Sequence, residues 1–161
     1  MFTRGIWKSV YLVETAPVAI EYLVPEVMYD GVAWPVTPWA DGDANFTVHA
    51  TVHVYAAAAT AGTLLLEGAW GAAISKMAAL VVGHNTITVT LAATGPALWW
   101  PSGMGKQRMY ELNATFTPAI GAAVRTGRRI GFRLAAFVTV CPYLHAVPHA
   151  LTVFFRPEMD V

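Results

Sequence analysis

Apolar and polar residues alternate with a period of two along much of this chain. The longest alternating run predicts a strand over 46–55, and its apolar positions are Phe46, Val48, Ala50, Val52 and Val54. Successive side chains of a β-strand point to opposite faces, so this pattern predicts a strand with one buried face. The same alternation recurs at 86–91 and 110–117. Shorter runs rich in β-branched and aromatic residues predict further strands at 6–13, 20–28, 63–67, 128–134, 137–140 and 151–155.

Turn-forming residues separate these runs, at 29–31, 41–43, 83–85, 101–103 and 125–127. Short strands divided by such turns are typical of an antiparallel sandwich or barrel, so we expect an all-β fold. One stretch is ambiguous. The Ala-rich residues 70–80 could form one or two helical turns, although Gly68 and Gly71 weaken that interpretation.

Composition indicates one well-packed domain, with room for pieces of its neighbours. The chain has 161 residues, of which 56% are hydrophobic and only 12% charged, so we expect a sizeable buried core and an ordered chain. Ten basic and ten acidic residues cancel, and the one basic cluster lies on a predicted hairpin at 125–133 (Arg125, Arg128, Arg129 and Arg133). We therefore expect no nucleic-acid partner. No apolar run reaches the roughly 18 residues of a membrane span, so no membrane partner is expected either. The N-terminus lacks the basic segment and long apolar core of a secretion signal.

Two patterns suggest metal binding and fail on inspection. Residues 41–45 begin like a calcium loop, but its sixth and twelfth places hold Phe46 and Val52 in place of the required Gly and Glu. His49 and His53 share a strand face without a third ligand nearby, so solvent-facing or interface histidines are favoured. His145 and His149 flank Pro148 in a predicted loop, with no partner in sequence. No metal ligand and no cofactor is assigned.

Catalytic residues are equally hard to find. Glycoside hydrolysis by a retaining mechanism needs two carboxyl groups about 5–5.5 Å apart. Glu21 and Glu26 lie five apart on one predicted strand and should face opposite ways, and the other acidic residues are scattered. Cys141 is the sole cysteine and is interpreted as a buried, inert thiol. No catalytic residue is assigned.

Tryptophans give the sharper alternative, because sugar rings stack on exposed aromatic faces. The candidates are Trp34, Trp39, Trp99 and Trp100. Packing in a core or against a neighbouring domain is the competing and favoured role, given the energetic weight of aromatic burial. Adjacent residues of an extended segment face opposite ways, so one of Trp99 and Trp100 should fill the sandwich and the other contact something outside it.

Residues 98–112 closely resemble a motif of glycoside hydrolase family 2 β-mannosidases. The segment reads L-W-W-P-S-G-M-G-K-Q-R-M-Y-E-L, against approximately L-W-W-P-x-G-x-G-x-Q-x-L-Y-x-L in the family. Residues 5–12, G-I-W-K-S-V-Y-L, resemble the end of the family's N-terminal sugar-binding jelly roll. Residues 129–133, R-I-G-F-R, resemble the strand that closes its immunoglobulin-like domain.

The resemblance implies an immunoglobulin-like antiparallel β-sandwich over 15–134. Residues 1–14 would then be the last strand of a preceding jelly roll or an extension, and 135–161 strands leading toward a catalytic (β/α)₈ barrel. The family's catalytic glutamates belong to that barrel, and no position here matches them. The implied role is non-catalytic, with the other domains of the parent polypeptide and its carbohydrate substrate as partners. Trp99, Trp100 and Arg133 are the candidate contacts to a neighbouring domain or to sugar.

Several alternatives remain open at this level. The parent could be a related exo-β-glucosaminidase or endo-β-mannosidase, or the chain could be a stand-alone carbohydrate-binding or adhesion module, or an inactive remnant. Asn45-Phe46-Thr47 and Asn113-Ala114-Thr115 satisfy the glycosylation pattern, which is consistent with a secretory or lysosomal parent.

Overall fold

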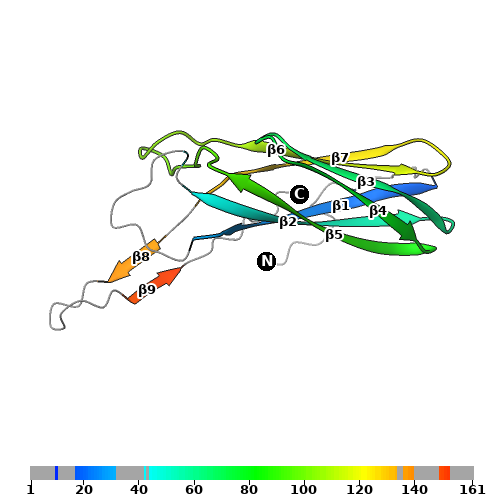
Figure 1. Cartoon of the computed structure of the whole chain (residues 1–161), viewed down its shortest axis with the longest axis horizontal. Coiled ribbons are helices and arrows are strands. Elements are labelled where there is room, and N and C mark those ends of the chain that lie inside the picture. Colours follow the sequence, from blue (N-terminus) through cyan, green and yellow to red (C-terminus); the bar gives the residue numbers. More distant parts are fainter. Residues whose placement is uncertain are drawn as a thin grey trace, which may run out of the picture.

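The fold of the chain is seen in a computed structural model (Figure 1). The structure describes residues 17–31 and 44–133, the single residues 10 and 42, and the backbone of 136–139 and 149–152. These residues form strands and no helix. The strands are β1 (Val18–Tyr29), β2 (Asn45–Ala56), β3 (Thr60–Gly68), β4 (Ala73–Leu80), β5 (Gly83–Thr94), β6 (Tyr110–Pro118), β7 (Val124–Ile130), β8 (Ala136–Thr139) and β9 (His149–Thr152).

Seven strands form two antiparallel sheets that pack face to face. One sheet has the order β1-β2-β5 and the other β4-β3-β6-β7, and β8 and β9 pair with each other. The predicted all-β sandwich is confirmed. A constant-type immunoglobulin domain places its fourth strand beside the fifth, whereas β4 here pairs with β3 in the opposite sheet. The sheets meet at their sides, where β1 lies beside β7 and β4 beside β5.

The alternation seen in the sequence determines the core. In β2 every second side chain from Phe46 to Ala56 is buried, and the residues between them are half exposed. Strand β6 supplies the opposing face with Leu112, Ala114 and Phe116, all fully buried. Each large apolar side chain buried in this way contributes about 1.5–3 kcal/mol.

Strand β1 is an edge strand interrupted by a β-bulge. Ile20 pairs with Val54 and Tyr22 with His53, so Glu21 is an extra residue without a partner in β2. The bulge changes the alternation that follows, and Leu23 is buried while Tyr22 is exposed. The prediction that Glu21 and Glu26 face opposite ways was therefore wrong, because counting by twos fails across a bulge. Both carboxylates are exposed.

The helix considered for residues 70–80 is a strand, β4. It lies at the edge of its sheet and exposes most of both faces, which obscured the period of two. Lys76 lies opposite the buried Leu64 and therefore on the inner face, and its Nζ donates a hydrogen bond of 2.9 Å to the carbonyl of Thr88 in β5. An inward-pointing charge is one way in which proteins prevent edge strands from pairing with other chains. The turns predicted at 83–85 and 125–127 are also wrong, since these residues lie within β5 and β7.

The polypeptide enters and leaves the sandwich at opposite ends. Seven antiparallel strands run the length of the sandwich, so β1 begins at one end and β7 finishes at the other (Figure 1). The first end, which we call the apolar end, carries Pro17 and the turns at 57–59, 81–82 and 119–123. The second, the tryptophan end, carries residues 69–72, 95–109 and 131–133. The 12 residues of β1 place the two ends about 40 Å apart.

Candidate functional site

The candidate contacts Trp99, Trp100 and Arg133 come together at the tryptophan end. The Trp99 amide donates to the Phe132 carbonyl at 2.7 Å, which ties the motif loop to the segment that follows β7. Trp99 also forms an isolated bridge with Gln107, and the Trp100 amide donates to the Lys106 carbonyl at 3.0 Å. These bonds close residues 99–107 into a compact loop.

The two tryptophans divide their roles as adjacent extended residues should. Trp100 is half buried and packs against the hydrophobic core. Gly105 lies directly beneath its ring, because a Cβ there would come within 2.7 Å of the Trp100 indole. Trp99 lies outside that core cluster with Arg133 over its ring, the guanidinium carbon being 5.3 Å from the ring centroid. The backbone at Gly131 packs closely against Trp99, since a Cβ on Gly131 would lie 3.2 Å from the Cβ of Trp99.

A buried aromatic cluster supports this loop from below. Phe132 is its centre, with ring centroids 5.2 Å from Phe46, 5.2 Å from Trp70 and 5.3 Å from Tyr110. The Trp70 Nε1 donates to the Ala92 carbonyl at 3.0 Å, so the turn between β3 and β4 is hydrogen-bonded to β5 of the other sheet. Edge-to-face aromatic pairs of this kind add about 0.5–1.5 kcal/mol each.

Tyr110 connects this cluster to the residues just before the motif loop. Its hydroxyl accepts a hydrogen bond of 2.9 Å from the Ala97 amide and donates one of 3.4 Å to the Ala97 carbonyl. A tyrosine near the start of this strand that bonds the upstream backbone is a feature of immunoglobulin sandwiches. The sequence pattern places Tyr110 only at the start of an alternating run, and it assigns no role to Trp70 beyond the start of the Ala-rich stretch.

The exposed surface of the tryptophan end combines arginine with apolar side chains. Arg108 lies over the Tyr110 ring with its guanidinium carbon 5.8 Å from the centroid, much as Arg133 lies over Trp99. Cation–π contacts at exposed sites contribute about 0.5–1 kcal/mol and orient the guanidinium plane. Met104 and Met109 are exposed close by. Such a surface suits a carboxylate or a hydroxyl-rich ligand together with apolar contact.

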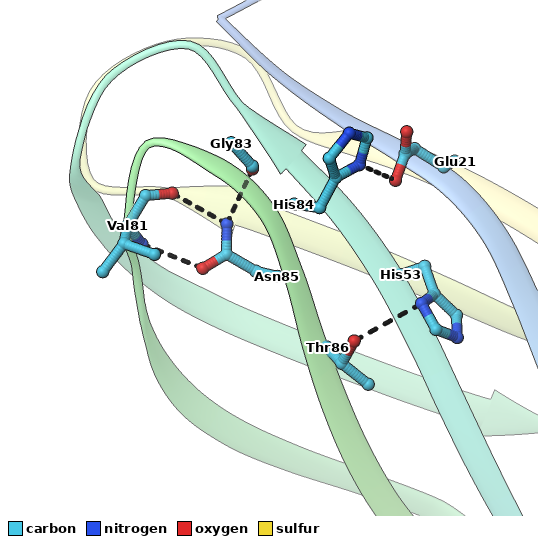
Figure 2. Close-up of polar contacts among 7 residues, drawn as sticks. All are labelled: Glu21, His53, Val81, Gly83, His84, Asn85 and Thr86. Atoms are coloured by element: carbon cyan, nitrogen blue, oxygen red, sulfur yellow. Dashed lines mark hydrogen bonds and ion pairs between the residues drawn. The ribbon is translucent and has the colours of Figure 1, made fainter.

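The histidines lie on the outer face of the three-stranded sheet. A ring nitrogen of His49 lies 3.2 Å from the Thr90 hydroxyl. A ring nitrogen of His53 lies 3.4 Å from the Thr86 hydroxyl (Figure 2). His53 also stacks on Tyr22, with centroids 4.2 Å apart. Among the described residues, no three His, Cys, Asp or Glu side chains come close enough to hold a metal ion. Trp34, Trp39, Asp41, Asp43, Cys141, His145 and the side chain of His149 lie outside the described residues.

The charged residues singled out in the sequence are dispersed. Arg125 and Arg129 project from the outer face of β7, while Arg128 lies opposite the buried Leu112 on the inner face. Of the two glycosylation patterns, Asn45 is exposed at the start of β2, and Asn113 is half exposed beside Gly127. In the described part of the chain, no helix is long and apolar enough to cross a membrane.

Comparison with curated proteins finds β-mannosidases. β-Mannosidase B of Emericella nidulans is 27% identical over 157 residues, covering 97% of this chain and 17% of that protein. β-Mannosidase A of Aspergillus terreus is 35% identical over 51 residues, or 32% of this chain and 6% of that protein. The chain thus spans only a small part of the length of the relatives that it matches. No protein-family model matches the chain.

Solved structures share the fold. The exo-chitosanase CsxA of Amycolatopsis orientalis gives a TM-score of 0.59 at 18% identity, covering 78% of this chain and 14% of that one. A β-D-mannosidase from Dictyoglomus thermophilum gives 0.51 at 14% identity, covering 76% and 14%. A β-glucuronidase from glycoside hydrolase family 2 gives 0.51 at 17% identity, covering 75% and 13%. The chain is therefore similar in sequence to β-mannosidases over almost its whole length and similar in fold to one part of family 2 glycosidases, which confirms the resemblance indicated by its motifs.

Proposed function

We propose that this chain is a non-catalytic sandwich domain of a β-mannosidase-like glycoside hydrolase, and that it holds the neighbouring domains in fixed relation. The longer polypeptide would hydrolyse terminal β-D-mannosides in oligosaccharides or glycoproteins. The domain boundaries predicted near residues 15 and 134 belong to this proposal. The observation that supports it best is that the polypeptide enters and leaves at opposite ends of one continuous core.

A positional role requires stiffness between the two ends. Strands β2 and β6 are central in their sheets and contribute fully buried side chains along their length. At the tryptophan end, Trp70 and Phe132 contact each other and tie the two sheets together. Retaining sites tolerate small displacements poorly, because a misplacement of about 1 Å can reduce the rate about 100-fold. A stiff spacer about 40 Å long suits that requirement.

The described carboxylates support a role without catalysis. Glu21, Glu26 and Asp30 are exposed on β1 and the residue after it, while Glu67 and Glu111 are exposed on the outer face of the other sheet. Glu67 faces Asn113 directly and Glu111 diagonally, and Arg129 lies directly opposite Glu111. A flat, exposed sheet face has no walls to hold a sugar ring or to exclude water from a general acid.

The experiment is a pair of measurements on the 161-residue chain. We expect no turnover of 4-nitrophenyl β-D-mannoside above background, and no saturable change in tryptophan fluorescence with mannose or β-1,4-mannobiose. Turnover that survives repurification would contradict the proposal. Saturable binding at millimolar sugar or below, abolished by Trp99→Ala, would instead favour the carbohydrate-binding module. One face of the Trp99 ring is already covered by Arg133, so at most the other face could stack on a sugar ring.

A further inference from the structure

The turns at the apolar end of the sandwich contain no polar side chain. They comprise Pro17, Ala57, Ala58, Ala59, Val81, Val82, Ala119, Ile120, Gly121, Ala122 and Ala123, all of them exposed. Ile120 is 89% exposed, and Val81 and Val82 are 65% exposed each. Surface turns normally favour Gly, Asn, Asp, Ser and Pro, because those residues satisfy the backbone or supply the unusual dihedral angles. Four adjoining segments made of Ala, Val, Ile, Gly and Pro therefore need another explanation.

These segments are neighbours in space. The Ala57 amide donates to the Pro17 carbonyl at 2.8 Å, and Ala56, just before this turn, pairs with Gly83, just after the next one. The Ala119 amide donates to the Ala61 carbonyl at 2.8 Å, which brings the turn at 119–123 to the start of β3. The apolar side chains therefore gather at one end of the two sheets rather than being scattered singly.

The side chain of Asn85 hydrogen-bonds the backbone of the turn between β4 and β5, and the two valines of that turn are exposed. Figure 2 shows Asn85 beneath the turn. Its Oδ1 accepts from the Val81 amide at 2.9 Å, and its Nδ2 donates to the carbonyls of Val81 at 2.8 Å and Gly83 at 2.9 Å. Three backbone polar groups of this turn, the amide and carbonyl of Val81 and the carbonyl of Gly83, are thus satisfied internally. A partner that covers the valines would thus leave none of these groups unpaired.

Polar and charged side chains lie on two sides of this end. On one side His84 Nδ1 lies 2.9 Å from Glu21 Oε2, with the His84 side chain 76% exposed (Figure 2). On another side Arg125 follows Val124 at the start of β7. A contiguous apolar centre with a polar rim is the anatomy of a protein interface. A lipid surface is disfavoured, because these turns carry neither the Trp and Tyr nor the Lys and Arg of membrane-facing segments.

The path of the chain identifies the occupant. The polypeptide enters β1 at Pro17, whose carbonyl accepts the Ala57 amide within this group of turns, so the described sandwich begins at the apolar end. The matched β-mannosidase B is far longer than this chain, which covers 17% of it. We propose that the apolar end is the seat of the domain that precedes β1 in the longer polypeptide, and that the facing surface of that domain is apolar and uncharged. This inference rests on the proposed function.

The test compares the 161-residue chain with the longer polypeptide of which we propose it is a part. Val82→Cys and, separately, Ile120→Cys are introduced after Cys141→Ser has removed the natural thiol, and the rate of labelling by a maleimide is measured. Both cysteines should react at the rate of an exposed thiol in the 161-residue chain and at least tenfold more slowly in the longer polypeptide. Equal rates in the two polypeptides would overturn the proposal.

Met77→Cys is the matched control. Met77 is 82% exposed on β4, away from the apolar turns, so its cysteine should react equally fast in both polypeptides. If the cysteines at 82 and 120 are already labelled slowly in the 161-residue chain, and dilution restores the fast rate, a second copy of the chain occupies the surface. That result also overturns the proposal. Far-ultraviolet circular dichroism of each variant shows whether it has folded.

Hydrolysis of 4-nitrophenyl β-D-mannoside by the longer polypeptide separates this inference from the proposed function. Protected cysteines in a polypeptide without glycosidase activity would overturn the proposed function and support the interface. Reactive cysteines in an active enzyme would overturn the interface and support the proposed function.

Discussion

Asn85 shows how one side chain can determine the character of a surface. It binds the amide and carbonyl of Val81 and the carbonyl of Gly83, and so replaces the water that a two-residue turn would otherwise need. Turns built on Asn or Asp use the same capacity of a short polar side chain to bond nearby backbone groups. Here the asparagine lies after the turn, so the turn positions themselves are free to be apolar.

Replacing Asn85 should destabilise the sandwich. Asn85→Ala removes three hydrogen bonds and leaves backbone groups of the turn without partners, so we expect the free energy of unfolding to fall by about 1–3 kcal/mol. Equilibrium urea denaturation measures the change. Asn45→Ala is the control, because the Asn45 side chain accepts a bond from the Gly95 amide at 3.2 Å, and it should have the smaller effect. Equal losses in the two variants would contradict this account.

Gly105 makes a second residue-scale prediction, about the packing of Trp100. Gly105→Ala would place a Cβ 2.7 Å from the indole, so the ring must move and we expect a loss of about 1–3 kcal/mol with a changed near-ultraviolet circular dichroism spectrum. Gly103→Ala is the matched control in the same loop. Its Cβ would meet nothing within 4 Å, although its φ of 83° makes the substitution strained. A loss of stability is therefore expected there with the tryptophan spectrum unchanged.

At the scale of elements, β4 and β5 are the edge strands along one side of the sandwich. Lys76 of β4 reaches across to the Thr88 carbonyl of β5 and occupies an acceptor that an added strand could use. Its charge on the inner face also disfavours the close approach of a second apolar edge.

Lys76→Val should therefore keep the fold and promote self-association. We expect native light scattering at micromolar concentration to rise over hours in the variant, because a β-branched apolar residue replaces the protecting charge. Ser75→Val, on the outer face of the same strand, is the control and should scatter less. If the two variants scatter alike, Lys76 does not protect the edge.

Elements also show how far sequence reasoning extends. Strands with one clean buried face, β2, β5 and β6, were predictable because their alternation is uninterrupted. Strand β4 was not, since an edge strand exposed on both faces loses its period and alanine then favours helix. The bulge at Glu21 was invisible, because register depends on the partner strand. At the tryptophan end the motif identified Trp99 and Trp100, but Trp70 joins them only through tertiary packing.

At the scale of the whole molecule, the proposed positional role predicts an effect on catalysis from residues distant from any active site. In the longer polypeptide, Arg133→Ala should lower kcat/KM for a β-mannoside about tenfold, equivalent to about 1.4 kcal/mol, by loosening the tryptophan end. Arg129→Ala, on the outer face of β7 opposite Glu111, is the control and should leave kcat/KM unchanged. Urea denaturation of the two variants as 161-residue chains should give similar free energies of unfolding. An Arg133→Ala enzyme with full activity would count against a role for this end in positioning.

The odd number of strands also limits how this sandwich can be rearranged genetically. Many domains have neighbouring termini and tolerate circular permutation or insertion into a surface loop of another protein. Here Val18 and Ile130 lie at opposite ends, so joining them would need a linker of about a dozen extended residues running along the outside of a sheet. A domain with this arrangement suits a position between two other domains of a polypeptide, and it is poorly suited to insertion into a surface loop.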